Sequence, residues 1–157
     1  MNDRRKLRLL IADDEGAITR IYSIGLQHYF APDDDSGTGD LDNEFFGDAG
    51  DDRPTADITV CQQGDEAVKL TRDAVKAGTP FDVVVLDIRM PPGISGVEAA
   101  KRIRTLDESV PILFVSGYSD FAVDDLQGLV PPVAKMDLIE KPVQLAKLAS
   151  KIKRLAG

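Results

Sequence analysis

The run from Phe81 to Leu86 constrains the fold of this chain more than any other segment. Apart from Asp82 it is wholly apolar, and it includes three consecutive valines. A run of this length and composition is typical of a strand that is buried on both faces, as in a parallel sheet. Asp87 closes the run, and open α/β sheets bind their ligands at the carboxyl ends of their strands. The segment therefore predicts an α/β sheet with an acidic residue at its binding edge.

A second apolar segment, residues 7–12, also ends in acids, Asp13 and Asp14. If both segments are strands of one parallel sheet, their acids share a pocket at the same edge. Three crowded carboxylates repel one another unless a cation neutralises them, and hard oxygen ligands favour Mg²⁺ or Ca²⁺. The sequence therefore predicts a divalent-cation site.

Apolar runs and helical patterns alternate along the chain. The predicted strands are residues 7–12, 58–61, 81–87, 111–116 and 136–140. The predicted helices are residues 15–29, 64–77, 96–105, 119–127 and 142–155. Five strand–helix units without an antiparallel hairpin predict a doubly wound parallel sheet.

Apolar faces on the first and last predicted helices indicate how they pack. The first helix is expected to bury Ile18, Ile21, Tyr22, Gly25 and Tyr29. The last helix is expected to begin with Pro142 in its first turn, where the missing N–H of proline is tolerated. Its buried face is expected to carry Leu145, Leu148, Ile152 and Leu155.

Length and composition place the chain in a broad class. At 157 residues it is long enough for one domain with a substantial core. No apolar run reaches the length of a membrane span, and the net charge of −8 argues against a nucleic-acid surface. Its single cysteine, Cys61, excludes an internal disulfide and suits the cytoplasm; its position in a predicted strand favours a buried packing role.

The negative charge is concentrated in residues 31–56. This segment holds nine acids and one base, so it accounts for the whole net charge of −8. Its glycines and prolines indicate a flexible acidic loop inserted between the first helix and the second strand. The alternative is a calcium loop that would use Asp33, Asp35, Gly37 and Glu44. That frame is disfavoured because Thr38 stands where the motif needs glycine for its sharp turn.

Four segments together resemble the receiver domain of two-component response regulators. They are Leu10–Glu15, Val84–Gly93, Phe114–Gly117 and Glu140–Pro142, in the order and nearly the spacing of that family. The resemblance covers residues 7–155 apart from the insert. It implies a flavodoxin-like (βα)5 sheet with strand order 2-1-3-4-5, in a single receiver domain that spans residues 1–157.

The resemblance also implies a phosphorylation site and its metal. Asp87 would accept a phosphoryl group from a phosphohistidine, and a carboxylate is chemically able to form such a covalent bond. Asp14, Asp87 and the backbone carbonyl of Arg89 would ligate Mg²⁺, while Asp13 would hold the ion through water. These roles agree with the chemistry of phosphoryl transfer, which depends on positioning and charge neutralisation.

Four more positions, and the side chain of Arg89, take roles from the resemblance. Ser116 would donate a hydrogen bond to the phosphoryl oxygens, and Lys141 would pair with them. Arg89 and Tyr118 would flank the path of the hydrolytic water, and their bulk implies slow self-dephosphorylation. Leu138 stands where the family usually has an aromatic switch residue. A muted or rerouted conformational change is therefore expected on the face of residues 119–127, 136–140 and 142–155, and Ser116 could still move.

The implied partners are proteins. A sensor histidine kinase or a histidine phosphotransfer protein would supply the phosphoryl group, and an unidentified protein target would receive the signal; neither nucleic acid nor a membrane is expected. Residues 143–157 are used by the last predicted helix, so no output module is expected in this chain. The domain would be a phosphoryl acceptor rather than an enzyme.

Two alternatives stay open at this stage. One is a small Mg²⁺-dependent phosphohydrolase with an aspartyl nucleophile, but such enzymes often carry a second acid two residues later, where this chain has Arg89. The other is a degenerate receiver that only binds proteins. A nucleotide triphosphatase is disfavoured because the chain has no glycine-rich phosphate-binding loop ending in Gly-Lys-Ser/Thr.

Overall fold

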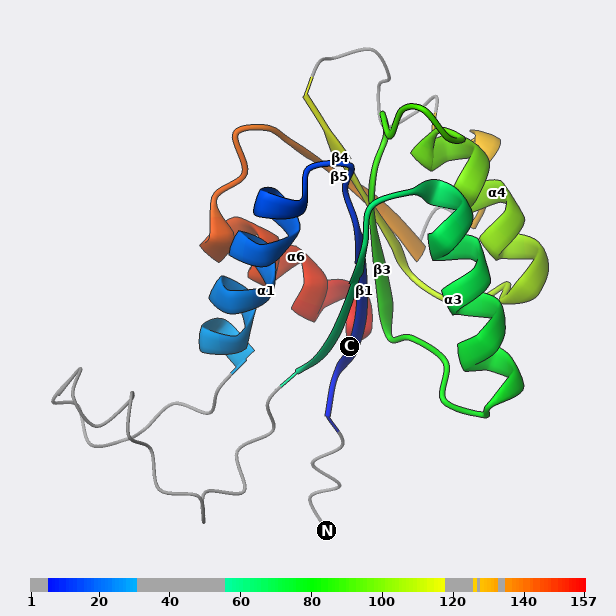
Figure 1. The fold of residues 1–157 in the computed structure, drawn as a ribbon. Helices are drawn as coiled ribbons and strands as arrows, with labels where there is room; N and C mark the ends of the chain where they lie inside the picture. Colours follow the sequence, from blue (N-terminus) through cyan, green and yellow to red (C-terminus); the bar gives the residue numbers. More distant parts are fainter. Residues whose placement is uncertain (1–5, 31–55, 118–125, 127, 133–134) are drawn as a thin grey trace, which may run out of the picture.

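A parallel sheet covered by helices on both faces forms the described part of the chain (Figure 1). The computed structural model describes residues 6–30, 56–117, 126, 128–132 and 135–157. Of the expected features, the insert at 31–56 lies outside these residues except for Ala56. The helix expected at 119–127 lies outside them except for Leu126.

The sheet contains five strands in the order β2-β1-β3-β4-β5, all parallel. They are β1 (Arg8–Ala12), β2 (Asp57–Cys61), β3 (Val83–Asp87), β4 (Ile112–Ser116) and β5 (Met136–Glu140). This order confirms the flavodoxin-like, doubly wound sheet. Because all five strands point the same way, their carboxyl ends meet at one edge.

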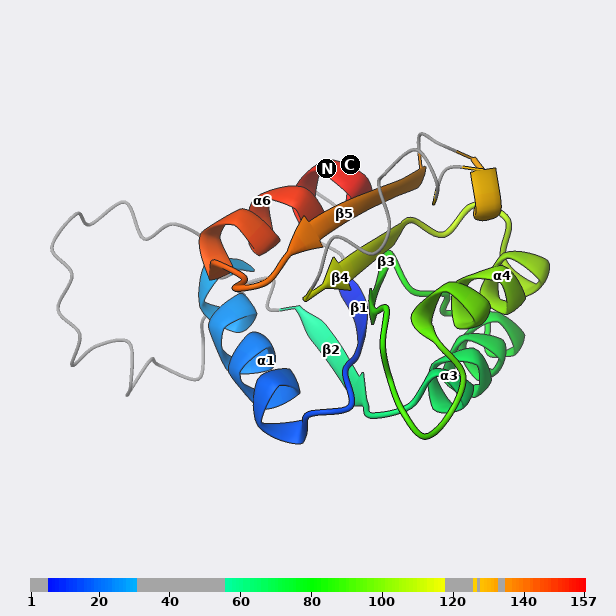
Figure 2. The same cartoon turned by 90° about the horizontal axis from the view of Figure 1, so that it is seen from above.

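Four helices pack on the sheet within the described residues. They are α1 (Gly16–Phe30), α3 (Gly64–Lys76), α4 (Gly96–Leu106) and α6 (Leu145–Ala156). Figure 2 shows α1 and α6 on one face of the sheet and α3 and α4 on the other. Each face has its own apolar core between helices and strands.

Strand β3 belongs to both cores. Val84 and Leu86 pack in the core under α3 and α4, whereas Val83 and Val85 pack in the core under α1 and α6. All four side chains are at most 1% exposed. The alternation explains why the strand is apolar throughout, since both of its faces are buried.

The buried face of α1 differs from the one that the sequence predicts. Tyr22 is buried as expected, but Ile21 is 54% exposed and Tyr29 is also exposed. The buried residues are Thr19, Tyr22 and Leu26. Apolar side chains lie on several sides of this helix, so periodicity alone does not identify the face that meets the sheet.

Other local expectations meet mixed outcomes. Helix α6 begins at Leu145 rather than at Pro142, which lies in the preceding turn; Leu148 and Ile152 are buried as expected.

Cys61 is a free, buried thiol, which confirms its packing role. Among the described residues, no helix combines the length and apolarity that a membrane crossing requires.

Candidate phosphoryl-acceptor site

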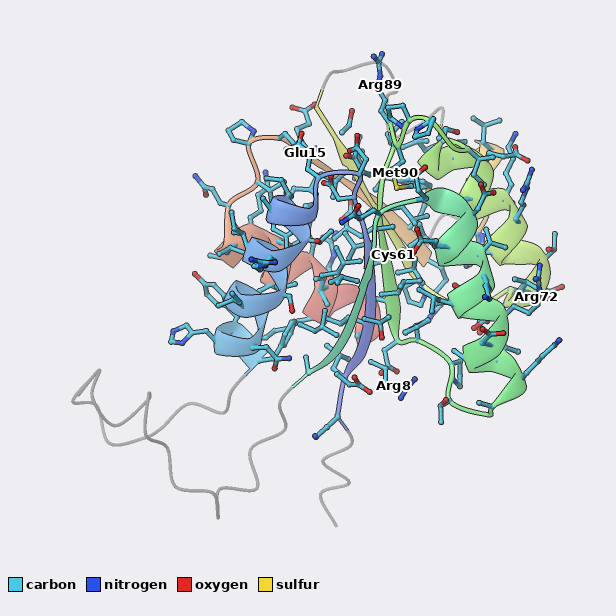
Figure 3. All side chains as sticks on the ribbon, in the orientation of Figure 1. Arg8, Glu15, Cys61, Arg72, Arg89 and Met90 are labelled. Carbon is cyan, nitrogen blue, oxygen red and sulfur yellow. The ribbon has the colours of Figure 1, made fainter. Side chains whose placement is uncertain are left out.

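The three acids predicted to share a pocket lie together at the carboxyl edge of the sheet. Strands β1 and β3 are neighbours, with Ala12 in register with Leu86, so Asp13 and Asp87 follow paired positions. One carboxylate oxygen from each of Asp13, Asp14 and Asp87 lies within 4.8 Å of the others. Figure 3 marks this edge by Glu15 and Arg89, with Arg8 at the opposite end of the sheet.

Lys141 brings a positive charge to this acidic cluster. Its Nζ lies 3.0 Å from Asp87 Oδ2 and 3.5 Å from Asp13 Oδ2. The backbone N–H of Lys141 donates to the carbonyl of Ser116 at 2.8 Å, which ties the end of β5 to the end of β4. The Lys141–Pro142 peptide is cis.

Backbone groups fix the orientation of both buried carboxylates. The N–H of Glu15 donates to Asp13 Oδ1 at 3.0 Å, and the N–H of Arg89 donates to Asp87 Oδ1 at 3.3 Å. Each acid therefore has one oxygen held by the turn that follows its strand. The second oxygens, Asp13 Oδ2 and Asp87 Oδ2, face Lys141.

The charges of the site shift the pKa values of its members. Burial raises the pKa of Asp13, and the nearby Asp87 charge adds to the rise; the Glu15 N–H and Lys141 only partly offset it. Burial alone would lower the pKa of Lys141, but its hydrogen bond to Asp87 and the charges of Asp87 and Asp13 raise it. The lysine is therefore an ammonium at neutral pH, whereas burial and the charge of Asp87 both disfavour the ionised form of Asp13.

The donor set fits a divalent cation. Three carboxylates and one ammonium leave an excess of two negative charges, and carboxylate oxygens are the ligands that Mg²⁺ prefers. Asp13 Oδ2 is buried, yet it has no hydrogen-bond partner among the described residues, and its 3.5 Å separation from Lys141 Nζ is long for a charged hydrogen bond. Buried polar atoms are normally satisfied, so this oxygen suits the coordination of a divalent cation or of a water bound to one.

The remaining predicted site residues take different positions. Ser116 is buried at the end of β4, in register with Glu140. Arg89 is exposed at the start of the loop after β3, and Figure 3 shows its side chain at the carboxyl edge of the sheet. Leu138 is partly buried against the core under α3 and α4 and pairs with Phe114. Tyr118 lies outside the described residues.

Two residues near the site were not identified as site residues from the sequence. A Cβ on Gly96 would overlap the carbonyl oxygen of Asp87, so only glycine lets the first turn of α4 lie against the end of β3. Tyr22 on α1 is buried, and its pKa is raised by burial and by the charge of Asp13. A glycine at a helix start and a tyrosine on a helix face are too common in sequences to indicate either role.

Comparisons with known proteins show the family and the fold of this chain. The family model of the response regulator receiver domain matches residues 44–153. The match begins after β1, although β1 lies between β2 and β3 in the same sheet. Asp13 and Asp14 thus precede the matched residues in sequence but share the site with Asp87.

Two transcriptional regulatory proteins are similar in sequence to this chain. The transcriptional regulatory protein TrcR of Mycobacterium tuberculosis is 29% identical over 153 residues, which are 98% of this chain and 46% of TrcR. The uncharacterized transcriptional regulatory protein YrkP of Bacillus subtilis is 32% identical over 120 residues, which are 76% of this chain and 45% of YrkP. The chain therefore spans less than half the length of either relative.

Solved structures share the fold. A response regulator receiver protein from Sinorhizobium medicae superposes with a TM-score of 0.66 at 22% identity, covering 96% of this chain and 94% of that chain. The chemotaxis protein CheY4 of Vibrio cholerae gives a TM-score of 0.65 at 22% identity, covering 96% of this chain and 98% of that chain. At such identities the likeness shows the fold alone.

Proposed function

This chain belongs to the response regulator receiver domain family, and we propose that its Asp87 accepts a phosphoryl group in a Mg²⁺-dependent reaction. Receiver domains of this family are phosphoryl acceptors that interact with sensor histidine kinases or phosphotransfer proteins and bind Mg²⁺ in an acidic pocket. The observation that carries the proposal is the gathering of Asp13, Asp14 and Asp87 beside the ammonium of Lys141.

The chemistry assigned to Asp87 is an in-line displacement. A carboxylate oxygen of Asp87 forms a P–O bond as the P–N bond of a phosphohistidine breaks; the imidazole leaves with the electron pair, neutral because its other nitrogen carries the proton. Asp14, Asp87 and the Arg89 carbonyl would hold Mg²⁺, with Asp13 acting through water. The bound ion supplies neutralisation of the phosphoryl charge. Lys141 and Ser116 bind the remaining phosphoryl oxygens in this proposal.

Intact mass spectrometry after incubation with acetyl phosphate and Mg²⁺ tests the proposal. We expect a lasting mass increase of one phosphoryl group, which is lost in the Asp87→Asn variant and when Mg²⁺ is chelated. Release of inorganic phosphate without retained label would instead support a phosphohydrolase. Absence of both label and release would support a degenerate receiver that only binds proteins.

We further propose that self-dephosphorylation is slow. Arg89 and Tyr118 occupy the two positions that flank the hydrolytic water in this family, and both side chains are bulky. Arg89 is exposed at the carboxyl edge of the sheet, where the acids lie. Replacing both by small residues should shorten the lifetime of the phosphorylated protein, whereas an unchanged lifetime would contradict the steric explanation.

We also propose a muted conformational response to phosphorylation. Leu138 has no ring that could rotate between exposed and buried positions, and it already packs against the core under α3 and α4. Ser116 is then the main mobile partner. Amide spectra with and without a beryllofluoride phosphoryl mimic should differ little over the face formed by residues 119–127, β5 and α6, and large shifts across that face would refute this expectation.

Residues 31–56 are proposed to be an acidic insert in one receiver domain that spans 1–157, tuning the choice of phosphoryl donor. Its flanks, the end of α1 at Phe30 and the start of β2 at Asp57, lie at the amino edge of the sheet. The 15-residue α1 places that edge about 20 Å from the acids. These anchor points are thus farther from the acids than the Debye length of about 8 Å at physiological salt. We propose that the charge of the insert acts on the docking of protein donors rather than on the acids.

A variant with a short Gly-Ser turn in place of the insert separates these effects. Its rate of labelling by acetyl phosphate should equal that of the full chain, since this small donor needs no docking surface. Its rates with candidate histidine phosphotransfer proteins should change, and the change should shrink at high salt. Equal rates with every protein donor would contradict a role in partner choice.

A further inference from the structure

The side chain of Gln63 spans from the end of β2 to the loop between β3 and α4. Its Nε2 donates to the carbonyl of Pro91 at 3.1 Å, and its Oε1 accepts from the N–H of Gly93 at 3.0 Å. One planar amide thus forms hydrogen bonds with a carbonyl and an N–H that lie two residues apart. Both bonds form only when the two backbone groups face the same way, so the contact specifies one conformation of the loop.

The backbone of Gln63 is itself well anchored. Gln63 occupies the N-cap position of α3, and its carbonyl accepts from the N–H of Ala67 at 3.1 Å. N-cap side chains usually bond to the first turn of their own helix, but that of Gln63 makes no such bond. The amide is free to reach across to the neighbouring loop instead.

The loop that Gln63 contacts carries a proposed metal ligand. Arg89, whose carbonyl would face the ion, lies two residues before Pro91. Backbone hydrogen bonds hold both ends of the loop: Ile88 N–H donates to Val115 O in β4 at 3.0 Å, and Gly96 N–H donates to Ile88 O at 2.8 Å, which joins the two ends. Between these ends, Gln63 holds the loop from the side of α3.

Gly93 fits this contact closely. A Cβ on Gly93 would lie 2.6 Å from Gln63 Oε1 and 3.4 Å from Asp65 Oδ2. The backbone of Gly93 is not in the left-handed region, so alanine is acceptable there apart from this crowding. Any side chain at residue 93 must therefore push the Gln63 amide away.

We propose that Gln63 is a positioning residue for the magnesium site, because its two hydrogen bonds hold the β3–α4 loop so that the Arg89 carbonyl faces the acids. The inference rests on the proposed function, since it concerns the same metal. Groups that orient metal ligands from the second layer typically contribute about 10- to 100-fold to affinity. The amide acts here through backbone two residues away, so the lower end of that range applies.

The test compares Mg²⁺ affinity among matched variants, measured by calorimetry. Gln63→Met keeps the length of the side chain but loses both hydrogen bonds, and we expect its Kd for Mg²⁺ to rise about 10-fold. Gly93→Ala should raise the Kd by crowding the same contact. If both substitutions act through one contact, the double variant should bind Mg²⁺ no more weakly than the weaker-binding single variant.

Gln27→Met is the matched control. The Gln27 side chain also donates to a backbone carbonyl, that of Ala56 at 2.7 Å, but it does so near the amino edge of the sheet. Gln27→Met and Gln63→Met should both lower the melting temperature, whereas only Gln63→Met should weaken Mg²⁺ binding. In metal-free protein, the Gly93 amide should exchange its hydrogen faster in Gln63→Met alone.

The possible outcomes distinguish a failure of the positioning role of Gln63 from a failure of the proposed receiver function. Unchanged Mg²⁺ affinity in Gln63→Met, or an equal loss in Gln27→Met, would overturn the positioning role while leaving the receiver function intact. Absence of Mg²⁺ binding by the unmodified chain would overturn the proposed function, and the inference with it.

Discussion

Replacing Asp13 by asparagine is expected to stabilise the metal-free protein. At an effective dielectric constant of about 20, like charges within 4.8 Å repel by at least about 3.5 kcal/mol, and both Asp14 and Asp87 lie that close to Asp13. Lys141, at 3.5 Å from Asp13, attracts it by about 5 kcal/mol on the same scale. Water screens the repulsion from the half-exposed Asp14. The remaining repulsion from the two acids is therefore nearly cancelled by the attraction to Lys141.

The burial of Asp13 decides whether the substitution raises or lowers the free energy of unfolding. The Asp13 side chain is only 2% exposed, and removing a carboxylate from water costs several kcal/mol more than removing an amide. Asparagine still accepts the hydrogen bond from Glu15 N–H through its oxygen. We expect a gain of about 1–2 kcal/mol, within the usual range for stabilising changes at functional sites. In a domain of this size, that is a rise in melting temperature of roughly 3–6 °C.

Urea unfolding at pH 7 with a chelator measures the gain, and two further conditions give the expected pattern. Because the pKa of Asp13 is raised in the folded protein, its destabilising effect fades as pH falls through that pKa, and the two proteins should converge in acid. In excess Mg²⁺ the unmodified chain should recover, since an ion at 100 times its Kd adds about 2.7 kcal/mol.

Asp137→Asn is the opposing control. Asp137 is also mostly buried, but Lys151 lies 2.9 Å away and Arg154 contacts the same oxygen. Removing this charge should destabilise the protein, because two cations lose their partner. If Asp13→Asn is no more stable than the unmodified chain without metal, or if both variants shift alike, the electrostatic reasoning is refuted.

Three further predictions concern other parts of the molecule. Gly96→Ala should destabilise the domain by about 1–3 kcal/mol in urea unfolding, because its Cβ overlaps the Asp87 carbonyl; an unchanged midpoint would contradict the close packing. Arg104→Met should cost about 2–3 kcal/mol in the same assay, since the guanidinium donates to the carbonyls of Pro131, Val110 and Lys135. Burial raises the pKa of Cys61 to about 12, so at pH 8 an aromatic disulfide reagent should label it only after unfolding.

The sheet and the acidic cluster were predictable because each rests on residues that are neighbours in sequence. Val83–Leu86 must be buried on both faces, and Asp87 follows directly, so strand and acid come together. The same holds for β1 and its acids. Parallel pairing then brings the two strand ends together, and the cluster follows from the fold.

Packing details were less predictable. Helix α1 has apolar side chains on several sides, so Ile21 and Tyr29 were wrongly expected to be buried together with Tyr22. Gln63 gave no warning either, because its partners are backbone groups of a loop nearly 30 residues away. Almost every residue has the same backbone groups, so the amino-acid sequence does not indicate which of them a side chain will contact.

The junction between α1 and β2 has a consequence for how such domains diversify. Arg8 and Asp57 begin paired strands and join through an ion pair of 3.2 Å, which closes the sheet at the junction itself. The register of β1 and β2 therefore does not depend on the number of residues between α1 and β2. Insertions and deletions can occur at this junction during evolution while the acidic edge of the sheet stays intact. The same property makes this junction a suitable point for attaching a fluorescent reporter.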